Sequence, residues 1–308
     1  MRPKRMWTLL KETIVLWYGK NAFQLAGAIA FFTLFSLAPL MILLVTVAGI
    51  ALGEEAARGE LTGQIEAVVG NRAAETVQSA VDRSRMERSG ILPTVLGVAA
   101  LLFGATTVFG QVQAALNHLW DVTSQPSRSG IRNFIRTRLV SLGLVLTLGF
   151  LLLVSFVLTL ALAAIVHYAS EWIPVPSVLA WLADLVLSLT VVTLLFALIF
   201  KVLPDVHLGW ADMWRGAFVA AGLFAVGQYG ISYYLTQTAP GSAYGTAGSL
   251  VILLMWVYYS ALILLFGAAF TRISVRERGG SVEPRSIAVR VRTEIVGEGM
   301  HEDRKVEA

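Results

Sequence analysis

The most constraining feature of this chain is the stretch from Arg215 to Arg272, which contains no Asp, Glu, Lys or Arg between its ends. Residues 240–248, rich in glycine and opened by a proline, divide this stretch into two segments of helical length. An α-helix rises 1.5 Å per residue, so about 20 apolar residues cross a bilayer core of roughly 30 Å. Each segment is long enough to cross once, which predicts a membrane hairpin.

The composition of the whole chain agrees with a membrane protein. Hydrophobic residues make up 56% and charged residues only 14% of the 308 residues, with a mean hydropathy of +0.70. Soluble domains carry about 25% charged residues. We therefore predict an all-α, polytopic membrane protein. The charge-poor stretches predict six transmembrane helices at about 25–52, 91–116, 139–167, 178–203, 212–236 and 249–273.

The organisation around these spans follows from amphipathic and charged segments. Trp7, Leu10, Ile14 and Trp17 recur at helical spacing, which predicts an amphipathic helix along the inner membrane surface. Similar spacing predicts short amphipathic helices in the first outer loop. We expect residues 1–278 to form one membrane domain and the charged residues 279–308 to form a disordered cytoplasmic tail.

The distribution of Lys and Arg predicts the orientation, because positively charged loops stay on the cytoplasmic side. Basic residues are concentrated before the first span, between the second and third spans, and after the last. The connections at 168–177 and 237–248 contain neither Lys nor Arg. The loop at 53–90 carries both signs of charge, and helix parity alone places it outside. Both termini are therefore predicted to be cytoplasmic.

Polar side chains inside the spans are the candidates for function. Asp184 lies well within the fourth span, where a carboxylate costs about 2.5–3.5 kcal/mol on the insertion scale. His167, Tyr233 and Tyr234 are expected at a similar depth near the outer surface. The group is a candidate substrate or proton site. Alternatively, Asp184 is a buried structural acceptor or reaches outer water.

Two further groups lie near the inner surface. Thr107, Gln111 and His118 share a helix face and predict an inner cavity, although polar groups of this kind also hold helices together. Arg132 and Arg136 lie one turn apart and are candidate contacts for anionic lipid headgroups. The positive-inside rule alone also produces such a pair.

Catalytic and cofactor motifs are missing from the sequence. The four histidines are scattered singly, and there is neither an HExxH motif nor a glycine-rich nucleotide loop followed by Lys. The chain lacks cysteine, which excludes disulfides and thiolate chemistry. We expect no enzymatic activity, no cofactor or metal and no nucleic-acid partner. Membrane lipids are the expected partners, with envelope proteins as further candidates.

Three motifs carry a resemblance to a known family. They are AGAIAFFTLFSLAP at 26–39, ALNHLWD at 115–121, and GSAYGTAGS at 241–249 followed by WVYYS and FGAAFTR. Together they resemble the YihY/BrkB family of bacterial inner-membrane proteins, over about residues 11–275. The resemblance implies a six-helix bundle in the cytoplasmic membrane, with links to serum resistance and envelope lipid export. It also implies that the family's former label, ribonuclease BN, is a misassignment.

One departure from the family pattern affects the candidate sites. Relatives often have Glu in the last span at the position where this chain has Ala269. They can also have Gln where this chain has Leu262. Asp184 is then the membrane-embedded acid left for ion coupling.

Three functions remain open from the sequence. The favoured hypothesis is transport or flipping of a lipid or amphiphile in envelope biogenesis. The alternative is a non-transporting membrane scaffold for envelope assembly, in which the polar groups are structural. Third is an ion or small-solute transporter.

Replacement of Asp184 by Asn distinguishes these hypotheses. If Asp184 binds substrate or proton, the variant reaches normal abundance in the membrane but loses lipid movement. Loss of the protein itself, measured by immunoblotting of membranes, instead supports a structural role. Normal abundance together with normal lipid movement removes Asp184 from the site.

Overall fold

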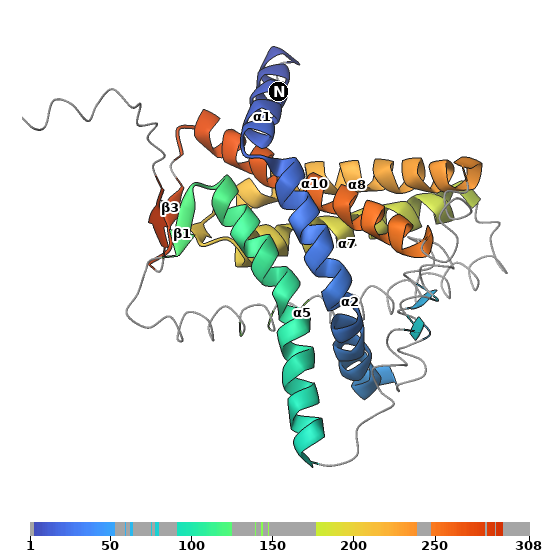
Figure 1. The fold of residues 1–308 in the computed structure, drawn as a ribbon. Coiled ribbons are helices and arrows are strands. Elements are labelled where there is room, and N and C mark those ends of the chain that lie inside the picture. Colours follow the sequence, from blue (N-terminus) through green and yellow to red (C-terminus); the bar gives the residue numbers. More distant parts are fainter. Residues whose placement is uncertain are drawn as a thin grey trace, which may run out of the picture.

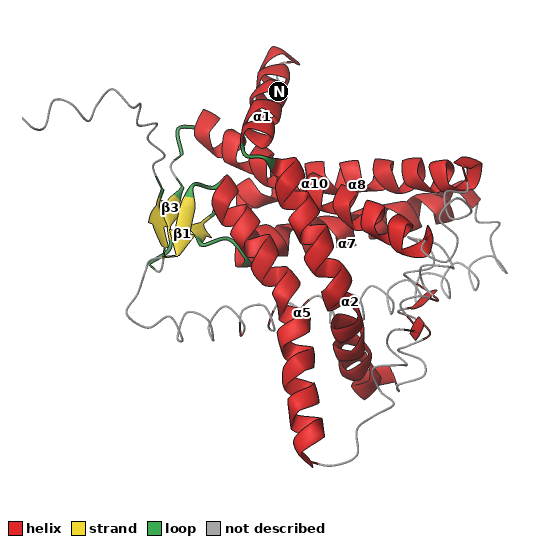
Figure 2. Cartoon of the chain, viewed as in Figure 1, coloured by secondary structure: helices red, strands yellow, loops and turns green. Residues whose placement is uncertain are grey.

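The computed structural model describes residues 3–52, 91–124, 177–238, 248–280, 282–286 and 288–291, together with isolated positions at 59, 62–63, 75, 78–79, 139, 143 and 147. Most of these residues are helical (Figure 2). The helices are α1 (Pro3–Gly19), α2 (Ala22–Leu52), α5 (Ile91–Leu119), α7 (Ser177–Val202), α8 (Trp210–Thr238) and α10 (Gly248–Glu277). The short strands are β1 (Val122–Ser124), β2 (Val206–His207), β3 (Glu283–Pro284) and β4 (Ala288–Arg290).

Five of the predicted spans coincide with long helices, namely α2, α5, α7, α8 and α10. The predicted span at 139–167 and the amphipathic helices of the first outer loop lie outside the described residues, apart from the isolated positions. Among the described residues, two segments are long and apolar enough to cross a membrane, Leu185–Val202 and Leu250–Glu277. The apolar segment Ala22–Leu37 is shorter.

The five long helices share one end and diverge from it. Figure 1 shows α2 and α5 running together toward the bottom of the view, whereas α7, α8 and α10 run toward the right. The start of α2, the ends of α5, α7 and α10 and the start of α8 meet beside the strands. Within each group neighbouring helices therefore run in opposite directions, α2 against α5 and α8 against both α7 and α10, as the hairpin prediction requires for α8 and α10. The two groups do not form one parallel bundle.

The hydrophobic core is concentrated near this shared end. Its buried members include Ala26 of α2, Leu116 and Leu119 of α5, Phe200 of α7 and Leu265 of α10. Small residues let the helix backbones approach there, as in other membrane helix pairs.

Helix α1 packs against the last turns of α10. Leu9 and Thr13 are buried on this side, with Leu9 against Phe270 and Ile273. Salt bridges join Arg5 to Glu277, at 3.1 Å, and Glu12 to Arg276. Helical spacing predicts Trp7 and Ile14 on the apolar face. Both are exposed, so α1 has one face against the protein and a second apolar face directed away from it.

The region beyond α10 departs from the expected disorder. Strand β4 pairs antiparallel with β1, and β3 pairs antiparallel with β2. The backbone N–H of Val291 also donates to the carbonyl of Asp121, at 2.8 Å. Residues 282–286 and 288–291 therefore return to the loops at the shared helix end, where they supply β-sheet partners. Residues 292–308 lie outside the described part of the chain.

Glycine permits unusually close contact between α8 and α10. A Cβ atom added to Gly216 would lie 1.8 Å from Thr271 Oγ1 and 2.5 Å from the carbonyl oxygen of Gly267. Gly267 is also confined, although less tightly, because its added Cβ would lie 2.8 Å from Ala220 Cβ. Only glycine fits these positions without moving the helices apart.

Replacement of Gly216 by Ala should destabilise the protein by about 1–3 kcal/mol, the usual cost of overpacking. The matched control is Gly222→Ala in the same helix, because nothing lies within 4 Å of the Cβ that it would add. We expect Gly222→Ala to be neutral or stabilising, since Ala favours helix. Thermal unfolding of both variants in detergent measures the difference, and equal melting temperatures would contradict the close packing.

Candidate functional site

A polar hub occupies the shared end of the helices. We define it by the side chains that join the helix ends and the segment after α10: Lys20, Gln113, Asn117, Asp121, Asp205, Arg272 and Arg285. Asp121 follows α5 with a positive φ of 54°. It forms salt bridges with Lys20, just before α2, and with Arg272 of α10, at 2.6 Å. Arg272 also donates to the carbonyl of Leu119, so it satisfies a free carbonyl at the end of α5.

The basic partners control the protonation of Asp121. Burial opposes ionisation and by itself raises the pKa of this carboxyl. Hydrogen bonds from Lys20 and Arg272, together with their positive charges, outweigh burial. The pKa of Asp121 is therefore held below its usual value of 3.8, and Asp121 is a carboxylate at neutral pH.

Asp205 is the second acidic residue of the hub, and amides rather than cations hold it. It is only 2% exposed. Asn117 donates to its carboxylate at 2.9 Å and accepts its backbone N–H at 2.8 Å. Gln113 donates to both carboxylate oxygens at 3.3 Å. These bonds fasten the α7–α8 connection to the last turns of α5.

Arg285 attaches the segment after α10 to the hub. Its guanidinium donates to the carbonyls of Lys201, at 2.6 Å, and Val202, at 3.3 Å. A cation at the end of α7 satisfies free carbonyls and interacts favourably with the helix dipole. The backbone N–H of Arg285 donates to the carbonyl of Asp205, at 2.9 Å. Its side chain and its backbone thus both contact the end of α7 and the following loop.

A polar cavity of about 510 Å³ adjoins the hub. Lys20, Gln113, Asn117, His118, Asp121 and Val291 are among its lining residues. Of the predicted inner-cavity residues Thr107, Gln111 and His118, only His118 lines it. Thr107 instead donates to the carbonyl of Phe103 in its own helix, at 2.6 Å. The neighbouring helix face, with Gln113 and Asn117, is the one that meets the cavity.

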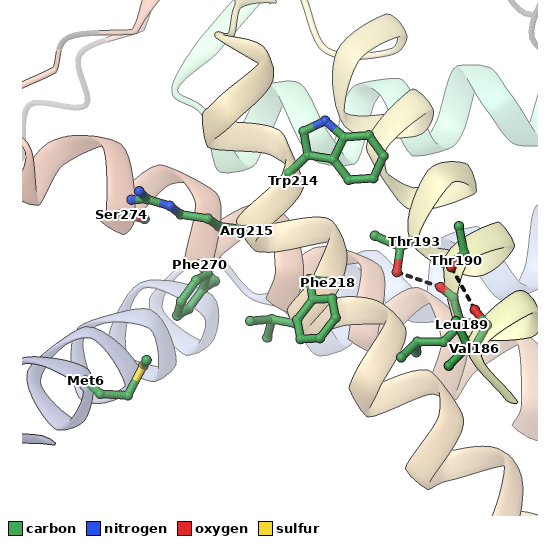
Figure 3. Close-up of a pocket in the computed structure, with 11 residues that line it drawn as sticks. Met6, Val186, Leu189, Thr190, Thr193, Trp214, Arg215, Phe218, Phe270 and Ser274 are labelled. Atoms are coloured by element: carbon green, nitrogen blue, oxygen red, sulfur yellow. Dashed lines mark hydrogen bonds between the residues drawn. The ribbon is translucent and has the colours of Figure 1, made fainter. Parts of the chain in front are cut away.

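An apolar groove of about 680 Å³ lies between α1, α7, α8 and α10. Its lining residues are Met6, Val186, Leu189, Thr190, Thr193, Trp214, Arg215, Phe218, Val219, Phe270 and Ser274 (Figure 3). The groove is open, because two of its lining residues, Val186 and Phe218, are more than half exposed.

Few polar groups face this groove. The hydroxyls of Thr190 and Thr193 donate to the carbonyls of Val186 and Leu189 in their own helix, both at 2.7 Å. Arg215 is the charged lining residue. Figure 3 shows its side chain extending from α8 toward Ser274 of α10. The groove is therefore an apolar surface with one cation at one end.

The other predicted site residues are only partly described. Asp184 lies in α7, and Tyr233 and Tyr234 lie near the end of α8, but their side chains fall outside the described part. The antiparallel course of α7 and α8 places these backbones away from the hub. His167, Arg132 and Arg136 lie outside the described residues. The grouping of Asp184 with His167 and the tyrosines stays a prediction.

Sequence reasoning missed both the hub and the groove. The amide pair Gln113 and Asn117, four residues apart on α5, was the available signal for a buried acidic partner. Arg215, which opens the long uncharged stretch, was the signal for a cation at the membrane edge.

Comparison with known proteins gives a consistent result. A family model described as virulence factor BrkB matches residues 17–289, which include β3 and most of β4. The putative ribonuclease-like protein YfkH of Bacillus subtilis is 26% identical over 265 residues, covering 84% of this chain and 92% of that relative. No solved structure matches the chain significantly.

Other relatives are named as membrane proteins. A UPF0761 membrane protein of Chromohalobacter salexigens is 30% identical over 268 residues, covering 84% of this chain and 61% of the relative. The UPF0761 membrane protein YihY of Escherichia coli is 28% identical over 182 residues, covering 58% of each chain. The chain thus spans about three fifths of the length of these two relatives.

Replacement of Asp121 by Asn should lower the free energy of unfolding by about 1.5–3 kcal/mol at pH 7, because it removes a charged acceptor from two basic donors. Folding lowers the pKa of Asp121, so its carboxylate stabilises the protein above about pH 3.8. This stabilisation is lost as the pH falls through the pKa of Asp121 in the folded protein, which lies below 3.8. Thermal unfolding at pH 7 and in the acid range measures the difference.

The control for this experiment is Glu283→Gln, which alters an exposed carboxylate in β3. We expect it to change stability by less than about 0.5 kcal/mol. A gap between wild type and Asp121→Asn that stays constant down to pH 3 would contradict the role given to the ion pairs.

Proposed function

Since this chain belongs to the virulence factor BrkB family, a family of membrane proteins, we propose that it moves a lipid or amphiphile in the bacterial inner membrane during envelope biogenesis. The observation that carries the proposal is the open apolar groove between α7, α8 and α10. A volume of about 680 Å³ falls within the range of sites for small molecules, roughly 300–1,000 Å³.

The position of the groove along the helices suits a lipid of one leaflet. At 1.5 Å per residue, Arg215 lies about 7 Å from the start of α8 and Val186 lies about 24 Å from the end of α7. Both distances are measured from the hub, because the end of α7 and the start of α8 lie there and a short connection joins them. The groove therefore extends over about half of a 30 Å hydrocarbon core. A lipid enters from the leaflet beside the hub, and its acyl chain follows the groove toward the middle of the membrane.

The chemistry of the walls favours an acyl chain over an ion. The threonine hydroxyls in the groove already donate to carbonyls of α7, and the remaining walls are mostly apolar. An ion or a small polar solute needs hydrogen bonds or opposite charges to replace its water. The two carboxylates at the hub, Asp121 and Asp205, are already held by their partners. These observations rank a lipid above an ion as the transported species.

The proposal is tested by a bulky residue that fills the groove. Thr190→Trp puts an indole into the space where the acyl chain lies and should reduce lipid movement at least tenfold. In proteoliposomes that contain fluorescent phospholipids, the movement is measured as the change in the fraction of dye that an impermeant reductant can reach.

The matched control is Val226→Trp on α8. Val226 is 69% exposed and does not line the groove. We expect its lipid movement to equal that of wild type. If the wild-type protein moves no lipid, the scaffold hypothesis replaces the proposal. If Thr190→Trp and Val226→Trp are equally active, the groove is not the path.

A further inference from the structure

Nearly every basic side chain around the hub already has a partner. Salt bridges join Arg5 to Glu277, Lys20 and Arg272 to Asp121, Arg276 to Glu12, and Arg278 to Asp212. Lys201, Arg285 and Arg290 donate to backbone carbonyls. Among the Lys and Arg side chains that the structure describes, which do not include that of Lys4, Arg215 and Lys11 have no such partner. Only Arg215 lines the apolar groove.

The described acidic residues on α1, α8 and α10, three of the helices around the groove, are occupied as well. Glu12, Asp212 and Glu277 are each paired with an arginine, so they are not available to a positively charged ligand. The unpaired guanidinium leaves this end of the groove with a net positive charge among the described groups. A ligand that complements it carries negative charge.

The surroundings of Arg215 are those of a membrane interface. Trp210 and Trp214 lie in the same turns of α8 and are both exposed. Tryptophan is enriched at the level of the lipid headgroups, because its ring is apolar and its N–H is polar. The guanidinium of Arg215 is thus placed where a headgroup lies, while the groove beside it faces the acyl chains.

In a bilayer, the charge of Arg215 determines which lipids the groove selects. Acyl chains gain no hydrophobic energy by leaving lipid for an apolar groove, because lipid tails are as apolar as the groove walls. The walls accept any acyl chain and do not select among lipids. Selection must come from polar contacts at the groove end, where Arg215 supplies the charge.

We propose that Arg215 binds the phosphate of an anionic phospholipid whose acyl chain occupies the groove, so that the protein prefers anionic to zwitterionic lipids. The proposal rests on the groove being the lipid site. The planar guanidinium pairs with two phosphate oxygens at once. A zwitterionic lipid offers the same phosphate together with an ammonium group. The described carboxylates of this region are already paired with arginines, so none is available to bind that ammonium group.

The absence of cysteine in this chain permits a direct binding test. A single cysteine at Val186, a groove residue that is 62% exposed, carries a fluorophore at the open rim of the groove, and bromine atoms on lipid acyl chains quench it on contact. The protein is reconstituted into phosphatidylcholine vesicles that contain increasing fractions of brominated phosphatidylglycerol or brominated phosphatidylcholine. The ratio of the two quenching curves gives the lipid preference at the groove.

We expect phosphatidylglycerol to be preferred about fivefold, the effect of one basic side chain near an anionic headgroup. Arg215→Gln should abolish this preference. The matched control is Lys11→Gln, which removes the other cation without a described partner and should retain the full preference. A fluorophore at Val226, on a face of α8 outside the groove, should follow the bulk lipid composition.

Equal quenching by the two lipids in wild type, or an unchanged preference in Arg215→Gln, would overturn the inference. Lipid movement by the unlabelled protein, in vesicles of the same lipid composition, separates this failure from that of the proposed function. Lipid movement without headgroup preference refutes only the role of Arg215. A headgroup preference without lipid movement refutes transport and leaves the lipid site in place.

Discussion

The ion pairs of Asp121 with Lys20 and Arg272 are the interaction on which the described structure most depends. They connect the beginning of α2, the end of α5 and the last turns of α10, which are far apart in the sequence. Charges near an apolar core are costly unless they are paired, so each of these side chains requires the others. The helix ends that meet at the hub are therefore fixed in position, and the helices diverge from that point.

The segment after α10 completes the hub and changes how this end of the protein is understood. Arg285 satisfies carbonyls at the end of α7, while β3 and β4 pair with the loops that follow α7 and α5. The bonds of Asn117 and Gln113 to Asp205 reinforce the same connection. This rigid end supports α7, α8 and α10, the three long helices that form the groove with α1.

The sequence predicted the helices better than it predicted their arrangement. Apolar stretches long enough to span a membrane placed five of the described helices almost correctly, because the spacing of charges is a local property. The pairing of residues 282–291 with two loops was not predictable, because strands of two or three residues have no clear pattern. Similarly, helical periodicity predicted that Thr107, Gln111 and His118 share the face that lines the inner cavity. In the structure the neighbouring face of α5 is the important one, because Gln113 and Asn117 bind Asp205 of the α7–α8 loop.

The sequence by itself determined that this is a helical membrane protein with its charges concentrated near helix ends, because hydrocarbon excludes unpaired charge from long segments. Only the tertiary structure decided which charges neutralise one another. That outcome depends on contacts between residues more than a hundred positions apart, such as Lys20 with Asp121 and Asp121 with Arg272. The pairing of Asp212 with Arg278, 66 positions apart, is of the same kind, and Arg215 on the same helix is left without a partner in the described part of the chain, beside a groove that no single helix contains.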